Sequence, residues 1–283
     1  MNKEKSKILI KNLVIAVAAF AVTIALGRII DIPVKGYAGS AICQLLAFVI
    51  YFIAACLANK KDILKFKTEG FGIGFIISIF ILIRTAMALI AFLNRNNGAP
   101  IVTVSILEVI SLVVFSLLVG LSEETLFRGV VQGSFHDYFG EDNSKHVRQA
   151  IIFASVLFGL VHLSNAIGGS NSIESVLAQV VSAIGGGLMF GTIYYRTNKN
   201  LWACTIIHAF NDFVSFVASG SLSGGTVSDS INSLTTGAEN ISASTAVAMG
   251  TIVQLLITVI SLFICLFFTR KKAVEKQLSK TNR

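Results

Sequence analysis

Long apolar runs, separated by short polar connections, cover most of this 283-residue chain. A helix that crosses the roughly 30 Å hydrocarbon core of a bilayer needs about 20 mostly apolar residues. The runs predict eight such helices, at about 11–30, 38–58, 70–93, 101–122, 148–165, 173–195, 201–218 and 245–269. The first run is too long for a signal-peptide core and lacks an Ala-x-Ala-like cleavage site, so we expect it to be retained. The pattern therefore predicts an all-α, polytopic helical bundle that forms a single membrane domain over 1–283.

Basic residues are distributed unevenly between the connections. Eighteen lie at the two termini and in alternate connections, whereas the intervening connections hold only Arg28, Lys35 and Arg95. By the positive-inside rule, both termini are expected to be cytoplasmic. The same clusters account for the formal net charge of +8. Because they flank apolar runs, their expected partner is the anionic surface of the lipid bilayer and not nucleic acid.

Composition agrees with the apolar pattern. Hydrophobic residues make up 54% of the chain and charged residues only 13%, about half the share that is usual in soluble domains. Cys43, Cys56, Cys204 and Cys265 all fall within predicted spans without C-x-x-C spacing, and we expect them to be small buried residues. Short loops and a composition rich in Lys, Ile, Asn and Ser are typical of a bacterial multi-pass protein of the cell membrane.

Three segments outside the spans have distinct compositions. Residues 219–243 are rich in Ser, Gly, Thr and Asn and are expected to form a flexible exterior loop. Residues 270–283 are expected to form a basic cytoplasmic tail. Residues 123–147 are expected to lie in the cytoplasm and to begin with an amphipathic helix that Gly140 ends.

Ionisable side chains at membrane depth are costly and are candidates for function. The predicted spans and their ends contain Arg84, Glu108, Glu123, Glu124, Arg128, His162, His208 and Asp212. Taken singly, each has an ordinary structural explanation, and we expect Arg84 to pair with Glu108. Their gathering in the second half of the chain favours a common site.

Helical spacing divides the acidic residues of "LSEETLFRGVVQG" (121–133). Glu124 and Arg128 are four residues apart and are expected to form an ion pair. Glu123 lies about 100° around the helix from Glu124 and remains free to face elsewhere. His208 and Asp212 also share a face, as do Phe158 and His162.

A free carboxylate and two histidines in a protected cavity suit hydrolysis. A Glu–His pair can activate water, and a His–Asp pair can donate hydrogen bonds to an oxyanion, with the Asp orienting the imidazole. The same residues, Glu123, His162 and His208, are an alternative ligand set for Zn²⁺ with one open position. The sequence contains no H-E-x-x-H, so the spacing does not indicate zinc.

Three segments resemble the motifs of the CAAX protease and bacteriocin-processing (CPBP, or Abi) family, namely E-E-x-x-x-R, F-x-x-x-H and H-x-x-x-N/D. They are "EETLFRG" (123–129), "FGLVH" (158–162) and "HAFND" (208–212), in the family's order. The resemblance covers 123–218, which we expect to be the catalytic core. It implies an intramembrane glutamate endopeptidase with no metal.

The resemblance also implies a role for each matching residue. Glu123 would be the general base, acting on water together with His162, and His208 with Asp212 would stabilise the oxyanion. Glu124 and Arg128 would support the site, with Phe158 and Asn211 beside the catalytic histidines. The chain departs from the commoner family pattern by having Asp212 where Asn is usual. The implied substrate is a peptide or protein within or at the membrane, such as a short peptide precursor.

Two alternatives come from other functional classes. The first is a non-proteolytic bacteriocin immunity protein or membrane scaffold with the same fold, although a scaffold has no need for all of Glu123, His162 and His208. The second is a transporter that uses Glu108, Glu123 and Arg84 as a relay. Transport predicts helices broken at mid-membrane, for which 71–76 and 184–191 are the only glycine-rich candidates.

Overall fold

The computed structural model describes residues 3–30, 32–34, 36–95, 105–167, 172–218 and 243–281. All of the expected exterior loop except its last residue lies outside these ranges. The α-helices are α1 (Lys3–Ile29), α2 (Gly36–Leu57), α3 (Phe71–Arg95), α4 (Ile106–Glu124), α5 (Gly133–Phe139), α6 (Ser144–Val161), α7 (Ile173–Arg196), α8 (Leu201–Ala218), α10 (Ala243–Phe268) and α11 (Lys271–Thr281). Between them lie the 3₁₀-helices η1 (Lys61–Leu64) and η3 (His162–Ala166) and the π-helix η2 (Thr125–Gln132).

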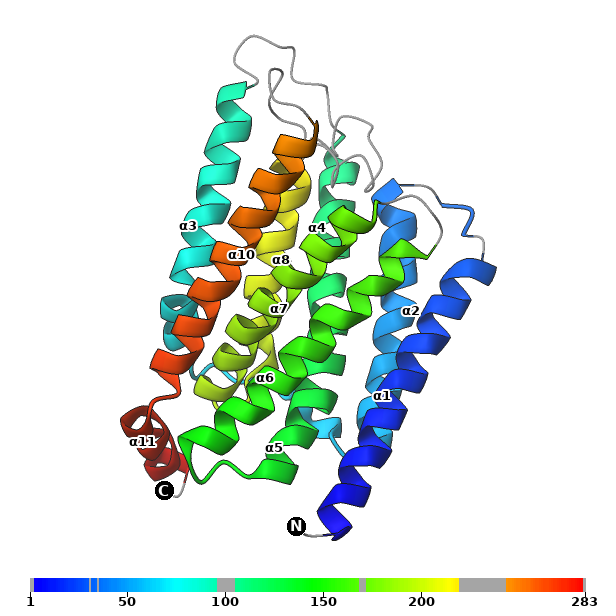
Figure 1. Cartoon of the computed structure of the whole chain (residues 1–283). Helices are drawn as coiled ribbons and strands as arrows, with labels where there is room; N and C mark the ends of the chain where they lie inside the picture. The colour runs from blue at the N-terminus through cyan, green and yellow to red at the C-terminus, as the bar shows by residue number, and fades with distance from the viewer. Residues whose placement is uncertain are drawn as a thin grey trace.

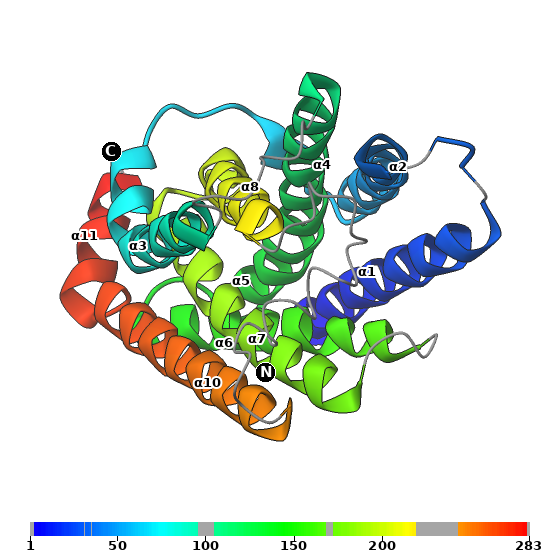
Figure 2. The same ribbon diagram turned by 90° about the horizontal axis from the view of Figure 1, so that it is seen from above.

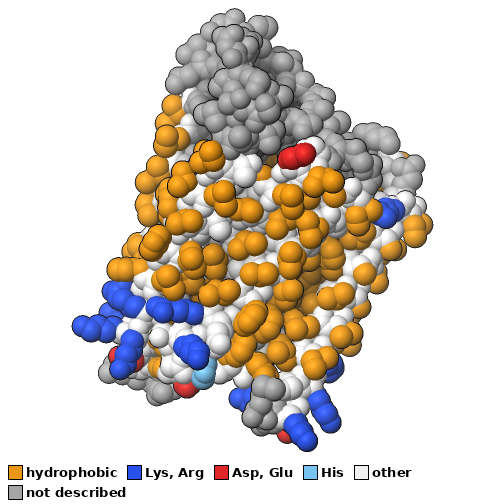
Figure 3. All heavy atoms as spheres, in the orientation of Figure 1, with side chains coloured by type: hydrophobic (Ala, Val, Ile, Leu, Met, Phe, Trp, Pro, Cys, Tyr) orange, Lys and Arg blue, Asp and Glu red, His pale blue; other side chains and the backbone are white. Residues whose placement is uncertain are grey.

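A long helix is present at each of the eight predicted spans. Six helices are long and apolar enough to cross a membrane, and α3 and α8 add the shorter apolar stretches Phe71–Met87 and Leu201–Val217. The described residues contain no β-strand. Hydrophobic side chains cover the middle of the face shown in Figure 3. The prediction of an all-α, multi-pass membrane protein is therefore confirmed.

Both termini lie at the same end of the bundle (Figure 1), and Lys and Arg side chains gather at this end (Figure 3). This arrangement agrees with the uneven distribution of basic residues along the chain. The basic tail is itself helical, because residues 271–281 form α11. We refer to this end as the terminal end and to the other as the distal end.

Close helix packing in the bundle depends on small residues. A Cβ atom added at Gly187 of α7 would lie 2.9 Å from Cα of Ser155 on α6, so only glycine allows the two helices this approach. The glycine-rich segment 184–191 lies within continuous α7, and 71–76 lies within continuous α3. The broken helices that the transporter alternative requires at these two places are therefore absent.

Helix α1 is attached to the bundle mainly near the terminal end. Viewed from above (Figure 2), α1 and α2 lie on one side of the molecule and α3 and α10 on the other. The buried residues of α1 are Asn12, Ala16 and Ala19. Asn12 Nδ2 donates a hydrogen bond of 3.0 Å to Ser134 Oγ of α5. From Phe20 onward, no described residue of α1 is fully buried.

Candidate active site

The sequence predicted that the polar motif at 123–128 begins a cytoplasmic connection. The structure instead places this motif inside the bundle. Helix α4 continues without a break through η2 and α5 to Phe139, and every residue from 124 to 136 is buried. The helix packs against α1, α2 and α6, which shield it from solvent. Its end at Gly140, with φ 85°, is where the sequence predicted it.

The segment after the two glutamates is a π-helix. In η2 the backbone hydrogen bonds span five residues instead of four, which widens the turn. Such turns are rare, and those that occur are frequently found at functional sites. All eight residues of η2 are buried, so the wider turn is part of the packed interior.

The expected ion pair between Glu124 and Arg128 is present. Arg128 Nε donates to Glu124 Oε2 at 2.8 Å, and both side chains are 0% exposed. The guanidinium carbon also lies 5.0 Å from the centre of the Phe158 ring, a cation–π contact that ties η2 to α6. This pair therefore supports the interior where α4, η2 and α6 meet.

Glu124 also binds His208, a contact that the spacing did not predict. His208 Nδ1 donates to Glu124 Oε1 at 2.8 Å, across 84 positions of sequence. The carboxylate therefore connects Arg128 on one side to His208 on the other. Asp212 was expected to orient the His208 imidazole, but the shortest contact of this ring is with Glu124.

A glycine brings the helices that carry these residues together. A Cβ atom at Gly120 of α4 would lie 2.8 Å from the carbonyl oxygen of Thr205 and 3.5 Å from Cβ of His208, both on α8. Gly120 is one helical turn before Glu124, so the close approach occurs directly beside the Glu124–His208 hydrogen bond.

The second ring nitrogen of His208 faces two more carboxylates. Nε2 lies 3.4 Å from Asp212 Oδ2 and 3.8 Å from Glu123 Oε2. The ring of Phe190 stacks on the imidazole, with centroids 4.7 Å apart and planes 15° apart. The imidazole is therefore fixed in its plane by Phe190 and in its rotation by Glu124.

His162 is the first residue of η3, directly after α6. Its Nδ1 lies 2.8 Å from the carbonyl oxygen of Phe158, which can only accept a hydrogen bond. Nδ1 therefore carries a proton, and in the neutral ring Nε2 has a free lone pair. The Phe158 ring packs edge-on against the imidazole, with centroids 5.2 Å apart. Phe158 thus holds His162 through both its backbone and its ring.

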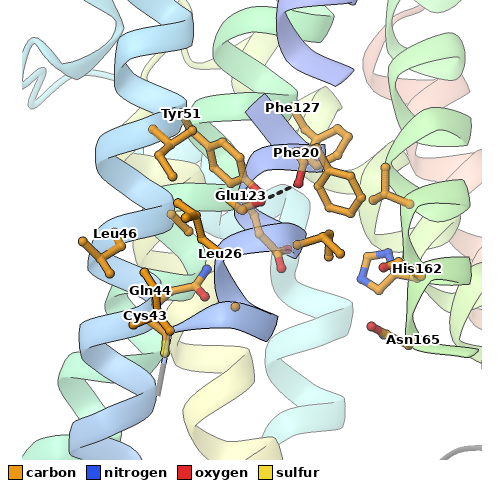
Figure 4. Close-up of a pocket in the computed structure, with 18 of the residues that line it drawn as sticks. Phe20, Leu26, Cys43, Gln44, Leu46, Tyr51, Glu123, Phe127, His162 and Asn165 are labelled. Atoms are coloured by element: carbon orange, nitrogen blue, oxygen red, sulfur yellow. Dashed lines mark hydrogen bonds between the residues drawn. The ribbon is translucent and has the colours of Figure 1, made fainter. Parts of the chain in front are cut away.

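Glu123 and His162 line one cavity of about 380 Å³. Its remaining walls come mainly from α1 and α2, which face α6 and η3 across the opening. Figure 4 shows Glu123 on one side of this cavity and His162 on the other. The Glu123 side chain is 27% exposed, in contrast to the fully buried Glu124. His208 and Asp212 are not among the lining residues, although His208 Nε2 lies 3.8 Å from Glu123 Oε2.

The polar residues of α3 and α4 have partners that the sequence argument missed. Glu108 forms a capping box with Ser105 at the start of α4 and does not pair with Arg84 as expected. Arg84 Nη2 instead donates to Asn211 Oδ1 at 2.7 Å. Asn211 Nδ2 donates in turn to Asp212 Oδ1 at 3.3 Å. Arg84 is thereby connected to the carboxylate that faces His208.

The arrangement of the donors was compared with the needs of a metal ion. In the ranges that the structure describes, no group of three or more His, Cys, Asp or Glu side chains is placed to hold a metal. His208 Nδ1 is bound to Glu124 and His162 Nδ1 to a backbone carbonyl. These contacts occupy only the Nδ1 atoms, and Glu123, His162 and His208 are not gathered into a ligand cluster in the described residues.

Residues 105–214 match a family model described as type II CAAX prenyl endopeptidase Rce1-like. The matched region runs from the start of α4 into α8 and contains Glu123, Glu124, Arg128, Phe158, His162, His208, Asn211 and Asp212. It agrees with the resemblance found from the three motifs. No curated protein sequence matches the chain.

Proposed function

We propose that this chain, whose residues 105–214 match the Rce1-like CAAX prenyl endopeptidase model, belongs to that family and is an intramembrane endopeptidase that cleaves a membrane-associated peptide or protein. The observation that carries this proposal is the placement of Glu123 and His162, from two different helical segments, on the wall of one cavity inside a membrane bundle. A hydrolase needs such a place, in which water, a base and a substrate carbonyl can meet.

Glu123 and His162 are proposed to activate the attacking water. The His162 Nε2 lone pair accepts a hydrogen bond from the water, and the Glu123 carboxylate takes its proton as the oxygen attacks the carbonyl carbon. The C–N bond then breaks, and the proton passes from Glu123 to the departing amine nitrogen. The products are a carboxylic acid and an amine, with Glu123 restored as a carboxylate.

His208 is proposed to stabilise the oxyanion. When Nε2 carries a proton, this N–H group can donate a hydrogen bond to the negative oxygen of the tetrahedral intermediate. Nε2 faces Glu123 and Asp212. Glu124, itself held by Arg128, fixes the opposite nitrogen of the ring. A donor that is already oriented stabilises the transition state without a reorganisation cost.

We propose that the reaction proceeds without a metal ion, since no group of three or more His, Cys, Asp or Glu side chains in the described residues is placed to hold one. The purified protein is expected to keep its activity with strong chelators present and to contain no stoichiometric zinc by elemental analysis. Chelator-sensitive activity together with bound zinc would assign Glu123 and the histidines to a metal instead.

The substrate is identified by comparing cells of the proposed bacterial host. Peptides in membranes and medium are compared by mass spectrometry between cells with wild-type protein and cells with Glu123→Ala. Hydrolysis predicts that specific fragments disappear in the variant and that their longer precursors accumulate, at equal levels of protein in the membrane. The immunity or scaffold alternative would be supported if the two peptide patterns were identical and the Glu123→Ala protein still protected the cells from a bacteriocin.

Arg84 is proposed to position Asp212 beside His208. We expect Arg84→Met to lower kcat by about tenfold or more, because a hydrogen bond to a charged group contributes about 1.5–3 kcal/mol. Arg84→Lys retains the charge and is expected to recover part of the loss. KM should change little, since Arg84 does not line the cavity. A variant that changes KM alone, or protein level alone, would contradict the positioning role.

A further inference from the structure

The cavity lies toward one end of the bundle. Its lining residues on α1 lie between Phe20 and Gly27, within about 15 Å of the distal end of that helix at 1.5 Å per residue. On α2 they lie between Cys43 and Tyr51, in the middle of the helix. On α6 they are followed by η3, at the distal end of the helix. The walls from α1 and η3 therefore lie toward the distal end, and the wall from α2 reaches from there to the middle of the bundle.

Burial decreases along the cavity from the terminal end to the distal end. Tyr51, Phe127 and Phe158, at its inner limit, are 5%, 5% and 4% exposed. Leu46 and Ile30, nearer the distal end, are each 41% exposed. Asn165 of η3 is exposed as well. The cavity is therefore closed toward the terminal end and open toward the distal end.

The closed side is continuous with a buried apolar cluster. Leu126, Phe127, Val130, Val131 and Phe135 of η2 and α5 form one apolar cluster with residues of α1, α2 and α6. This cluster fills the space between the cavity and the terminal end.

Charge assigns the two ends to the two sides of the membrane. The connections at the terminal end carry Lys60, Lys61, Lys65 and Lys67 between α2 and α3, and Arg196 and Lys199 between α7 and α8. The positive-inside rule places such clusters in the cytoplasm. The distal end, where the cavity opens, is then the extracytoplasmic end.

We infer that the catalytic cavity takes its substrate from the extracytoplasmic side, as a polypeptide segment held in the outer half of the bilayer. This inference rests on the proposed function for its substrate, but the side of access is independent of catalysis. Apolar side chains of α1 face the opening, and the lining also contains Gln44, which donates to Ser122, and Asn165, which donates to Gln179 at 2.9 Å. Such a lining fits an extended peptide with apolar side chains whose backbone needs hydrogen-bond partners.

Two native thiols on α2 provide a matched test. Cys43 lines the cavity and Cys56 lies at the terminal end of the helix, and both are exposed, contrary to the expectation that they are buried. Cys204 and Cys265 are buried. A charged, membrane-impermeant maleimide is added to intact cells that carry the full chain with either Cys56→Ser or Cys43→Ser. We expect labelling of the Cys56→Ser protein, in which Cys43 remains, and loss of labelling in the Cys43→Ser protein.

A second pair of sites covers the case in which a serine variant fails to accumulate. In a chain with both exposed thiols replaced, Gly27→Cys or Gly72→Cys is introduced. A Cβ atom at either glycine meets nothing within 4 Å, so neither change disturbs packing. Gly27 lines the cavity, and Gly72 lies at the terminal end of α3. Labelling from outside is expected at Gly27→Cys only, and labelling of Gly72→Cys only in inside-out vesicles.

The outcomes separate the side of access from the catalytic proposal. Labelling of Cys43 or Gly27→Cys only from the cytoplasmic face, or from neither face, would overturn extracytoplasmic access. The same labelling pattern is expected in a Glu123→Ala background, because water reaches the cavity whether or not catalysis occurs. If Glu123→Ala still cleaved peptides, the catalytic assignment would fail and the labelling result would stand.

Discussion

Glu123→Gln is expected to abolish peptide-bond hydrolysis while the amount of protein in the membrane stays unchanged. Glutamine has nearly the same shape as glutamate but cannot take a proton from water. Loss of a general base typically costs about 10²–10⁴ in rate. Glu123 is partly exposed in the cavity, and its contact with His208, at 3.8 Å, is too long for a hydrogen bond, so the fold does not depend on it. The measurement is kcat with purified protein in lipid vesicles.

Glu123→Asp is the matched control for this variant. It retains the carboxylate but withdraws it from the water by one methylene, so a measurable part of the activity should remain. Full activity of Glu123→Gln would show that another group is the base. Full loss in both variants with a normal level of protein would indicate that the distance, as well as the carboxylate, is required.

Arg128→Ala is expected to cause the largest loss of stability of any single substitution in the site. It leaves the Glu124 carboxylate buried without its cation, which typically costs about 3–5 kcal/mol. It also removes the guanidinium from the Phe158 ring. The expected result is a reduced level of protein in the membrane and a lower midpoint of thermal unfolding in detergent.

A double variant distinguishes stability from catalysis. Replacing both partners, with Glu124→Gln and Arg128→Met, removes the two charges together and is expected to recover most of the lost stability. It should not recover full activity, because a neutral amide holds the His208 ring less firmly than a carboxylate does. Arg128→Ala with normal stability would contradict the supporting role of the ion pair.

Local features of the fold and the site could be predicted from the sequence. The spans follow from the length of the apolar runs. The Glu124–Arg128 pair follows from a four-residue spacing, and it forms even though Arg128 lies in the π-helix. The end of α5 follows from Gly140, whose positive φ suits glycine. In each case the determining residues are close together in sequence.

The remaining contacts depend on tertiary packing. Nothing in the periodicity of "TLFRGVVQ" distinguishes a π-helix from an α-helix, and the Glu124–His208 and Arg84–Asn211 bonds each join residues more than 80 positions apart. The partner of Glu108 is different. Ser105 three residues before Glu108 is the pattern of a capping box, so this partner could have been found from the sequence. The exposed cysteines were missed because composition does not tell which face of a span meets the bundle.

The attachment of α1 has a mechanical consequence. Its fully buried residues and its hydrogen bond to Ser134 are confined to the half near the termini, and the half beside the cavity is held by partly buried side chains and by one hydrogen bond of 2.9 Å between Thr23 Oγ1 and the Tyr51 hydroxyl on α2. Segments with few buried contacts open at a low free-energy cost. We therefore expect the distal half of α1 to move away from α2 and α6 more easily than the other helices move. The helices that carry Glu123, His162 and His208 are packed deeply and do not share in that motion. The cavity thus combines rigid walls that carry the reactive groups with one wall, the distal half of α1, that can move at a lower free-energy cost.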